Sequence, residues 1–414
     1  MSVKKVLGNV VAFGIAIGIC LCVSEGVLRA LLNPTEDGNL LVRGKPFKPF
    51  QFPKKTVLKW HQIYENEVAK VPSPVGIKYH PLLGWTNNPN HQPYYNAQGT
   101  RNPGKTFPLF PEDGVTRIAL FGDSFTRDSK VKFEESWGFL LEKYMNEAGF
   151  RVEVMNFGVS GYGIDQAYLR WEVDGQVYHP NVVILGLYPA EIGRNLEVHH
   201  LKNWGLFDGG NAYSKPRFVI KSDNELELIN SPTLPPTELM SKAESFGELP
   251  FIEYDSIYLN NLNDFIMNPW RFLWIGRLVE ANLSANRFNS MDYHKHDDLY
   301  DLNKEAAQVS LKIIKKFGDS VRQRSARFII LNIAQVQDIY YLQHGKPLRY
   351  APLLENLERE WTVVRTEEEI QKHSLEHLFV ANDGHHAPLG SKVVAEVISS
   401  YLKDEQPLYR VASH

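Results

Sequence analysis

The stretch "RIALFGDSFTRD", from Arg117 to Asp128, is an apolar run that ends in the small and polar residues Gly-Asp-Ser. A short apolar run is typical of a strand that is buried on both faces in a parallel sheet. In open α/β sheets, ligands bind beyond the carboxyl ends of the strands, which is where Gly122 and Ser124 fall. Ser124 also lies near a possible helix N-terminus, where backbone N–H groups can meet an anion. A polar helix cap explains the same residues without any chemistry, so this motif alone leaves both interpretations open.

Segments typical of strands and of helices alternate from Arg117 to the C-terminus. Short apolar runs predict the strands, and segments with helical apolar spacing predict the helices between them. Such alternation implies a parallel sheet with helices on both faces, so the predicted fold class is α/β. The predicted strands are 117–122, 152–158, 181–188, 327–334 and 361–366, and the predicted helices are 136–149, 165–173, 303–324 and 387–403.

A second polar motif, "VANDGHHAPLG", precedes the last predicted helix and places Asp383 three residues before His386. A serine hydroxyl is a poor nucleophile until an imidazole takes its proton, and that imidazole needs an acceptor that fixes its tautomer. An Asp-x-x-His turn can supply both groups. A polar loop with Pro388 in the first turn of a helix is the structural alternative. For the adjacent His385, a helper role and plain surface exposure are both open.

Three sequence blocks together resemble the SGNH/GDSL hydrolase family. They are "GDSFT", "NFGVSGYG" and "DGHHAPLG". The resemblance implies that Ser124 is the nucleophile, that its backbone N–H and that of Gly161 form an oxyanion hole, and that Asp383 and His386 complete a triad. It also implies a doubly wound parallel sheet in a three-layer sandwich, and hydrolysis or transfer of an ester-linked acyl group.

The resemblance covers roughly residues 79–191 and 310–402. The segments "NAQGTRNP" and "EESWGFLLEKY", on either side of the first block, resemble those of anchored bacterial members of the family.

One block departs from the family pattern. Members usually follow the third strand with Gly-x-Asn-Asp, whose asparagine donates to the oxyanion, whereas this chain has "ILGLYPAEIGRN". Ala190 and Glu191 are placed roughly where Asn-Asp would stand, and an alanine side chain has no donor. Asn195, five residues further on, is the candidate substitute for the third donor. A degenerate or repurposed site is the alternative.

The N-terminus carries an uncharged apolar segment from Val6 to Ser24. Its roughly 19 residues would rise about 28 Å as a helix, close to the hydrocarbon thickness of a bilayer. An uncleaved membrane anchor is expected, because no convincing cleavage site follows; a cleaved signal peptide and a buried core helix are the alternatives. Lys4 and Lys5 favour a cytoplasmic N-terminus, which places the rest of the chain on the periplasmic or extracellular side.

The predicted organisation has three parts. Residues 1–32 are the anchor, 33–115 are a tether and an irregular wrapping segment, and 116–414 are the hydrolase domain with an insert at about 196–300. Within the insert, "KPRFVIKSDNELELINSP" predicts a hairpin with its turn around Ser-Asp-Asn. The aromatic segment "NPWRFLWIGRLVE" predicts a helix that packs on the domain or forms a lid.

Charge and histidine spacing exclude other classes of site. The formal net charge is −3 without a basic stripe, so no nucleic-acid partner is expected. The pairs His199–His200 and His294–His296 match no metal-ligand spacing, and we expect neither a metal nor a cofactor. Both cysteines, Cys20 and Cys22, lie in the apolar segment, so they give no evidence on disulfides.

The sequence therefore predicts a membrane-anchored serine esterase that hydrolyses an O-acyl ester. The favoured substrate is a glycan or lipid of the cell envelope. An O-acyltransferase to a polysaccharide and a catalytically degenerate binding or assembly protein are the alternatives.

Overall fold

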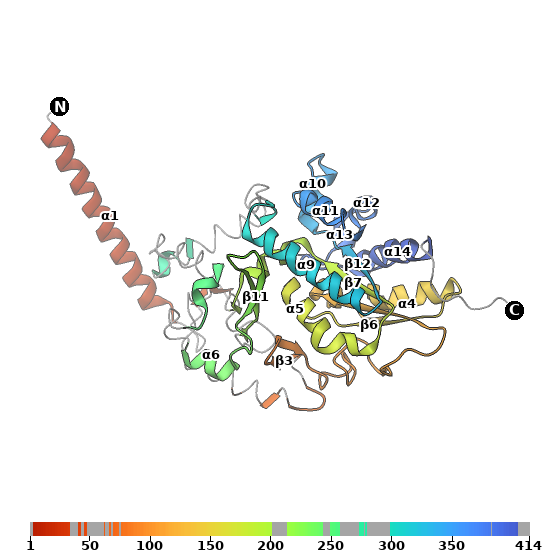
Figure 1. Ribbon diagram of the computed structural model, residues 1–414. Helices are drawn as coiled ribbons and strands as arrows, with labels where there is room; N and C mark the ends of the chain where they lie inside the picture. Colours follow the sequence, from red (N-terminus) through yellow and green to blue (C-terminus); the bar gives the residue numbers. More distant parts are fainter. Residues whose placement is uncertain are drawn as a thin grey trace.

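Five parallel strands form the central sheet in the order β13-β12-β7-β5-β6, as the computed structural model shows (Figure 1). The structure describes residues 3–33, 40–42, 45–47, 62, 66–67, 69–73, 76–200, 213–242, 249–256, 273–276, 278–279, 299–381 and 383–404. The predicted α/β class and all five predicted strands are confirmed. The strands are β5 (Thr116–Gly122), β6 (Val152–Asn156), β7 (Val182–Leu187), β12 (Arg327–Asn332) and β13 (Thr362–Arg365).

The inner strands β5 and β7 are buried on both of their faces, which is why they appear in the sequence as continuous apolar runs. Along β5, Ile118 and Leu120 belong to the apolar core on one side of the sheet, and Ala119 and Phe121 to the core on the other. This alternation follows from the two-residue period of a strand. The two cores make the sheet the middle of three layers.

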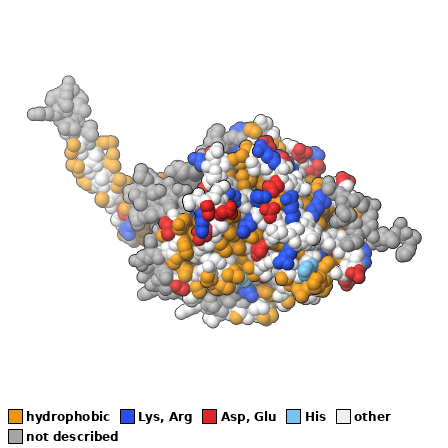
Figure 2. All heavy atoms as spheres, viewed as in Figure 1, with side chains coloured by type: hydrophobic (Ala, Val, Ile, Leu, Met, Phe, Trp, Pro, Cys, Tyr) orange, Lys and Arg blue, Asp and Glu red, His pale blue; other side chains and the backbone are white. Residues whose placement is uncertain are grey.

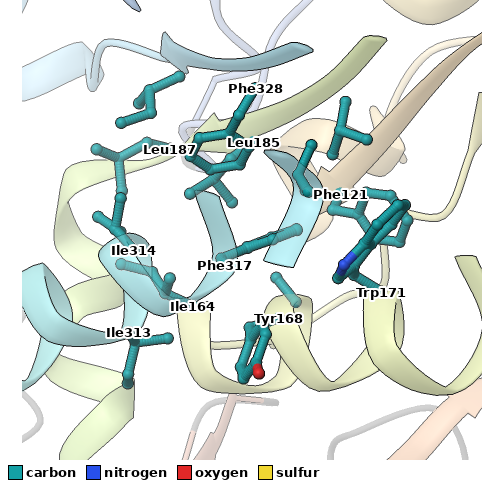
Figure 3. Close-up of a cluster of buried hydrophobic side chains, with 14 of the residues drawn as sticks. Phe121, Ile164, Tyr168, Trp171, Leu185, Leu187, Ile313, Ile314, Phe317 and Phe328 are labelled. Carbon is teal, nitrogen blue, oxygen red and sulfur yellow. The ribbon is translucent and has the colours of Figure 1, made fainter. Parts of the chain in front are cut away.

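Helices cover both faces, as predicted. The helices α5 (Ile164–Arg170), α9 (Glu305–Gln323) and α11 (Ala351–Leu357) pack on one face, where Phe317 of α9 lies among Phe121, Trp171 and Phe328 (Figure 3). The helix α9 is held there by an apolar stripe with helical spacing. The other face carries α4 (Trp137–Glu147), α10 (Val336–Gln343), α12 (Glu367–Ile370), α13 (Leu375–Leu378) and α14 (Pro388–Asp404).

The strand order places a binding crevice at one end of the sheet. Numbered among themselves in chain order, the five strands lie as 5-4-3-1-2, which is one of the two common doubly wound arrangements. The chain leaves β5 toward one neighbour and returns on its other side as β7, so the switch point lies between these two strands. Ser124 comes directly after β5 and is therefore placed at that switch point.

The segment before β5 wraps against the domain. It contains the antiparallel pair β3 (Ile77–His80) and β4 (Gly84–Asn87), and its side chains reach the core: Asn87 donates to Gly158 O at 3.0 Å and Asn102 donates to Val154 O at 2.9 Å. Further toward the N-terminus, β1 (Leu40–Val42) pairs with β2 (Lys45–Phe47).

The insert is described in part. Its hairpin of β10 (Arg217–Ile220) and β11 (Leu226–Ile229) is confirmed, with Asn224 at φ +68° in the turn. The short pair β8 (His199–His200) and β9 (Tyr213–Ser214) precedes it, and α6 (Pro236–Lys242) follows it. Most of the helix predicted at 268–280 lies outside the described residues. The predicted division of the chain at 32 and 115 stays a prediction.

The apolar N-terminal segment forms one long helix, α1 (Val3–Leu31), which projects from the body of the protein (Figure 1). Within it, Val11–Leu31 is long and apolar enough to cross a membrane or to act as a signal sequence. Orange apolar side chains run along this helix where it stands clear of the body, whereas acidic and basic side chains are interspersed on the visible face of the domain (Figure 2).

Candidate active site

Ser124 begins a one-turn helix, α3 (Ser124–Arg127), immediately beyond β5. The side chain of Asp123 caps this helix by accepting a hydrogen bond from Phe125 N–H at 2.8 Å. Gly122 is required at the turn: its φ is +149°, and a Cβ there would lie 2.2 Å from Thr126 Oγ1 and 2.6 Å from Gly186 O. The Gly-Asp-Ser order of the opening motif thus combines a tight strand end, a helix cap and a serine in the first turn of the helix.

The structure brings Ser124 together with Asp383 through His385. The Ser124 hydroxyl lies 2.8 Å from His385 Nε2, and His385 Nδ1 is hydrogen-bonded to Asp383 Oδ1. With the proton on Nδ1, the imidazole accepts from the serine and donates to the carboxylate. Gly384 between them has φ +84°, and this left-handed turn directs Asp383 and His385 toward each other. The geometry is that of a nucleophile, a base and an orienting acid.

The prediction that His386 serves as the base is contradicted by this geometry. The His386 backbone is extended and forms a bridge with Phe379, so its side chain points opposite to that of His385. The ring is only 1% exposed, and neither of its nitrogens has a hydrogen-bond partner among the described residues. It contacts the rings of Phe125 and Phe379 instead. His386 is a neutral core residue behind the site.

We expect His386 to make the fold sensitive to acid. Burial, reinforced by the nearby charge of His385, lowers the pKa of His386 to about 3 from 6.5. Below its ordinary pKa the unfolded chain therefore binds a proton here that the folded chain does not, so the free energy of unfolding falls as the pH falls. Between pH 7 and pH 5, urea denaturation should show a loss of stability about 2 kcal/mol larger in the wild type than in His386→Leu. An equal loss in both proteins contradicts this role.

Lys130 forms an ion pair with the carboxylate of Asp383. Lys130 Nζ lies 2.8 Å from Asp383 Oδ2, and the two side chains are 44% and 27% exposed. Burial raises the pKa of Asp383, but the hydrogen bonds from Lys130 and His385 outweigh this effect and bring the pKa below its usual value. The lowered pKa favours the carboxylate form of Asp383, which can accept a hydrogen bond from His385.

An aromatic side chain packs on the face of the His385 ring. Phe125 stacks on the His385 ring at a centroid distance of 4.5 Å and on the Tyr188 ring at 4.0 Å. The imidazole therefore lies against an apolar wall that leaves its nitrogens facing Ser124 and Asp383. The sequence reading missed Phe125, although it stands next to the serine in the motif.

Gly161 lies in a turn that suits an oxyanion donor. Tyr162 N–H donates to Val159 O, and Gly161 has φ +79° at the third position of this turn, which is the type II geometry that favours glycine. In the part of the chain that the structure describes, neither Ser124 N–H nor Gly161 N–H donates to another protein group. The oxyanion roles of both groups stay predictions.

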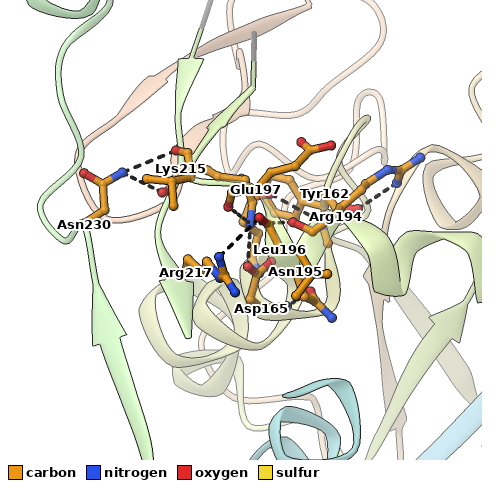
Figure 4. A network of polar contacts seen from close by, with 12 residues as sticks. Tyr162, Asp165, Arg194, Asn195, Leu196, Glu197, Lys215, Arg217 and Asn230 are labelled. Atoms are coloured by element: carbon orange, nitrogen blue, oxygen red, sulfur yellow. Dashed lines mark hydrogen bonds and ion pairs between the residues drawn. The ribbon is translucent and has the colours of Figure 1, made fainter. Parts of the chain in front are cut away.

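Asn195 does not face this site. Its amide Nδ2 donates to Ser310 Oγ at 2.8 Å, its Oδ1 accepts from Asp165 N–H at 3.2 Å, and the side chain is fully buried (Figure 4). The prediction of Asn195 as third donor is therefore wrong for this arrangement.

The third block is also displaced from its predicted alignment. In the parallel register Gly186 of β7 lies opposite Gly122 of β5. With Gly186 as the glycine of Gly-x-Asn-Asp, the asparagine position falls on Tyr188, two residues before Ala190. Glu191 accepts from Tyr188 N–H at 3.3 Å and is buried, which raises its pKa well above the usual range. The block thus lacks an amide donor in either alignment.

The same region contains an arginine that the sequence reading passed over. Arg194 Nη1 donates to Asp123 Oδ2 at 2.8 Å and to Tyr162 O at 2.7 Å. Arg194 belongs to the 3₁₀ segment η4 (Pro189–Leu196) that follows β7. Its position relative to Ser124 depends on the strand register, so no local pattern of the sequence signals it.

The histidine pairs do not form a metal site in the described residues. His199 Nε2 is hydrogen-bonded to Pro250 O, and His200 Nδ1 to Glu197. No group of three metal-ligating side chains converges within the described ranges. His294 and His296 lie outside those ranges.

Comparison of the sequence with protein-family models and with curated proteins finds no match. Similar solved structures include a lipolytic protein of the G-D-S-L family from Desulfitobacterium hafniense, with 12% identity, a TM-score of 0.34, and coverage of 69% of this chain and 98% of that chain. They also include TesA, with 11% identity, a TM-score of 0.37, and coverage of 70% of this chain and 99% of that chain. For the acetyl xylan esterase AlAXEase the identity is 12%, the TM-score is 0.35, and the coverage is 69% of this chain and 99% of that chain. Because these TM-scores lie below 0.5, the likenesses do not by themselves establish an activity. The solved structures to which the chain is similar thus include GDSL-type lipolytic proteins and esterases.

Proposed function

We propose that the protein is a serine esterase that hydrolyses O-acyl esters, with Ser124 as nucleophile, His385 as general base and Asp383 as the group that orients the base. The observation that carries the proposal is the continuous relay of hydrogen bonds from Ser124 Oγ through His385 to Asp383. A hydroxyl, an imidazole and a carboxylate in this order are what acyl transfer through a serine requires.

In the proposed reaction, Ser124, His385 and Asp383 each have a distinct role. Ser124 Oγ attacks the ester carbonyl carbon while its proton passes to His385 Nε2, and the carbonyl π electrons move onto oxygen. Collapse of this intermediate restores the C=O bond and expels the alkoxide, which takes the proton from Nε2. Water then repeats the sequence on the acyl-enzyme, releasing the acid and free Ser124. Asp383 stabilises the imidazolium in both halves.

We further propose that α1 anchors the enzyme in a membrane, with the domain on the periplasmic or extracellular side. The supporting observation is the exposed apolar span Val11–Leu31, which few contacts bury. An esterase held there would meet acyl esters of envelope glycans or lipids, and this is the substrate class that we assign.

One labelling experiment tests both proposals. Membranes containing the full chain are washed with alkaline carbonate, treated with a fluorophosphonate probe and digested for mass spectrometry. We expect the washed pellet to retain the chain with its N-terminus and to carry the probe on Ser124, with no label on the Ser124→Ala variant. A labelled chain in the supernatant would contradict the anchor alone, whereas an unlabelled Ser124 in folded protein would contradict the catalytic assignment.

A further inference from the structure

The site as described has two backbone donors for an oxyanion and a vacant third position. Ser124 N–H and Gly161 N–H come from the loops after β5 and β6. The family pattern adds an amide from the loop after β7, where this chain has Tyr188, and Asn195 points into the core. Loss of one such donor lowers the rate by about 10²–10³-fold. An efficient enzyme with this loop needs a donor of another kind.

The side chain of Arg194 contacts both donor loops. Nη1 donates to the carboxylate of Asp123, the residue before Ser124, and to the carbonyl of Tyr162, the residue after Gly161. The guanidinium is therefore held by the residues that adjoin the two backbone donors. It comes from the loop after β7, which is the loop that supplies the amide in the family pattern.

Part of the guanidinium takes no part in these two hydrogen bonds. Both hydrogen bonds are made by Nη1, and within the described residues no acceptor binds Nε or Nη2. The side chain is 25% exposed, whereas its partner Asp123 is fully buried. A guanidinium has five N–H groups in a planar fork, so its inner edge can hold the ion pair while its outer edge remains free to bind a ligand oxygen.

The local charges keep this group cationic without leaving it uncompensated. Burial lowers the pKa of Arg194, but the carboxyl groups of Asp123 and Glu191 outweigh this effect and raise it. Asp123 balances the charge in the resting enzyme, so the outer edge offers hydrogen-bond donors without a large attraction for ground-state anions. Donors placed in this way act mainly on charge that develops during the reaction.

We infer that Arg194 supplies the third oxyanion donor, from Nε or Nη2, in place of the missing amide. The inference rests on the proposed esterase function and names a further catalytic residue of that site. As Ser124 Oγ bonds to the carbonyl carbon, the carbonyl oxygen gains the electron pair of the broken π bond. Arg194 then hydrogen-bonds that oxygen together with Ser124 N–H and Gly161 N–H, and it neither gains nor loses a proton.

The test compares hydrolysis of p-nitrophenyl acetate by the full-length wild type, Arg194→Ala, Arg194→Lys and a matched control, Arg365→Gln. Arg365 is a similar arginine, 27% exposed and paired with Glu358. It lies on β13, three strands and therefore about 14 Å from β5. We expect kcat of Arg194→Ala to fall about 10²–10³-fold with KM changed less than about threefold, because the lost contact exists mainly in the transition state. Arg365→Gln should keep the wild-type kcat.

Two further measurements separate catalysis from packing. Guanidinium chloride at concentrations far below those that denature the protein should restore part of the kcat of Arg194→Ala, whereas equal sodium chloride should not. Should Arg194→Ala fail to fold, Arg194→Lys decides: it keeps a cation beside Asp123 but not the fork, so its kcat should fall at least about tenfold with an unchanged Tm.

The outcomes are distinguishable. Wild-type kcat in Arg194→Lys or Arg194→Ala overturns the inference while leaving the esterase proposal intact. A loss of kcat that follows a loss of Tm, without guanidinium rescue, assigns Arg194 to packing and also overturns it. Absence of hydrolysis and of Ser124 labelling in the folded wild type overturns the proposed function, and the inference with it.

Discussion

Replacing His385 by alanine is expected to lower kcat by about 10⁴–10⁶-fold, because the serine loses the base that takes its proton. The same measurement on His386→Leu should give a kcat within severalfold of the wild type. His385 Nε2 lies 2.8 Å from Ser124 Oγ, whereas both nitrogens of His386 are buried without a partner among the described residues. Two adjacent histidines thus serve as a matched pair, and initial rates on p-nitrophenyl acetate compare them directly.

The control for this comparison is the double variant Ser124→Ala/His385→Ala. Members of one relay act as a unit, so the double variant should be no slower than either single variant. Leucine at 386 keeps the apolar packing against Phe125 and Phe379, which limits any indirect effect on the site. A large loss of kcat in a folded His386→Leu, together with an active His385→Ala, would assign the base to His386 and contradict the geometry described above.

The two histidines also show where sequence reading reaches its limit. The apolar runs of the five strands and the spacing of α4, α9 and α14 predicted the layers correctly, because burial on a sheet or along a helix imposes a period on the chain. No such periodicity distinguishes His385 from His386 as the partner of Ser124. The distinction depends on the left-handed φ of Gly384 and on the bridge between His386 and Phe379, and neither is visible as a pattern.

The predicted alignment of the third block was wrong for a similar reason. The predicted place of this block depends on where the third strand ends, and strand ends are the features that a sequence predicts least precisely. The register of Gly122 opposite Gly186 moves the block by two residues. Arg194 is far from Asp123 in the sequence, and Lys130 is far from Asp383, so only the fold brings each pair together and spacing could not predict these contacts.

We expect the largest loss of stability when a buried ion pair is broken. No sequence pattern predicts this pair. Lys215 of the insert and Asp165 of α5 are both fully buried and hydrogen-bonded to each other (Figure 4). Lys215 Nζ also donates to the carbonyl oxygens of Arg194 and Glu197 at 3.0 and 3.3 Å. The lysine therefore ties the insert to the segment that carries Arg194.

Lys215→Met should lower the free energy of unfolding by about 3–5 kcal/mol, because removing one partner leaves the other as an uncompensated buried charge. Burial already raises the pKa of Asp165, which shows how unfavourable that environment is for a lone carboxylate. Urea denaturation measures the effect. Lys221→Met is the matched control on the same insert: its pair with Glu227 is 47% and 45% exposed and is expected to contribute less than about 1 kcal/mol.

The double variant Asp165→Asn/Lys215→Met identifies the cause of this loss. Asparagine keeps an acceptor for Gln166 N–H, which Asp165 Oδ1 now binds at 2.8 Å, while removing the charge. If the unpaired carboxylate causes the instability, the double variant should be more stable than Lys215→Met alone, as expected when a buried pair is replaced together. If Lys215→Met costs no more than Lys221→Met, the ion pair does not hold the insert. In that case contacts such as the hydrogen bonds of Thr233 with Tyr79 and Pro81 provide the attachment.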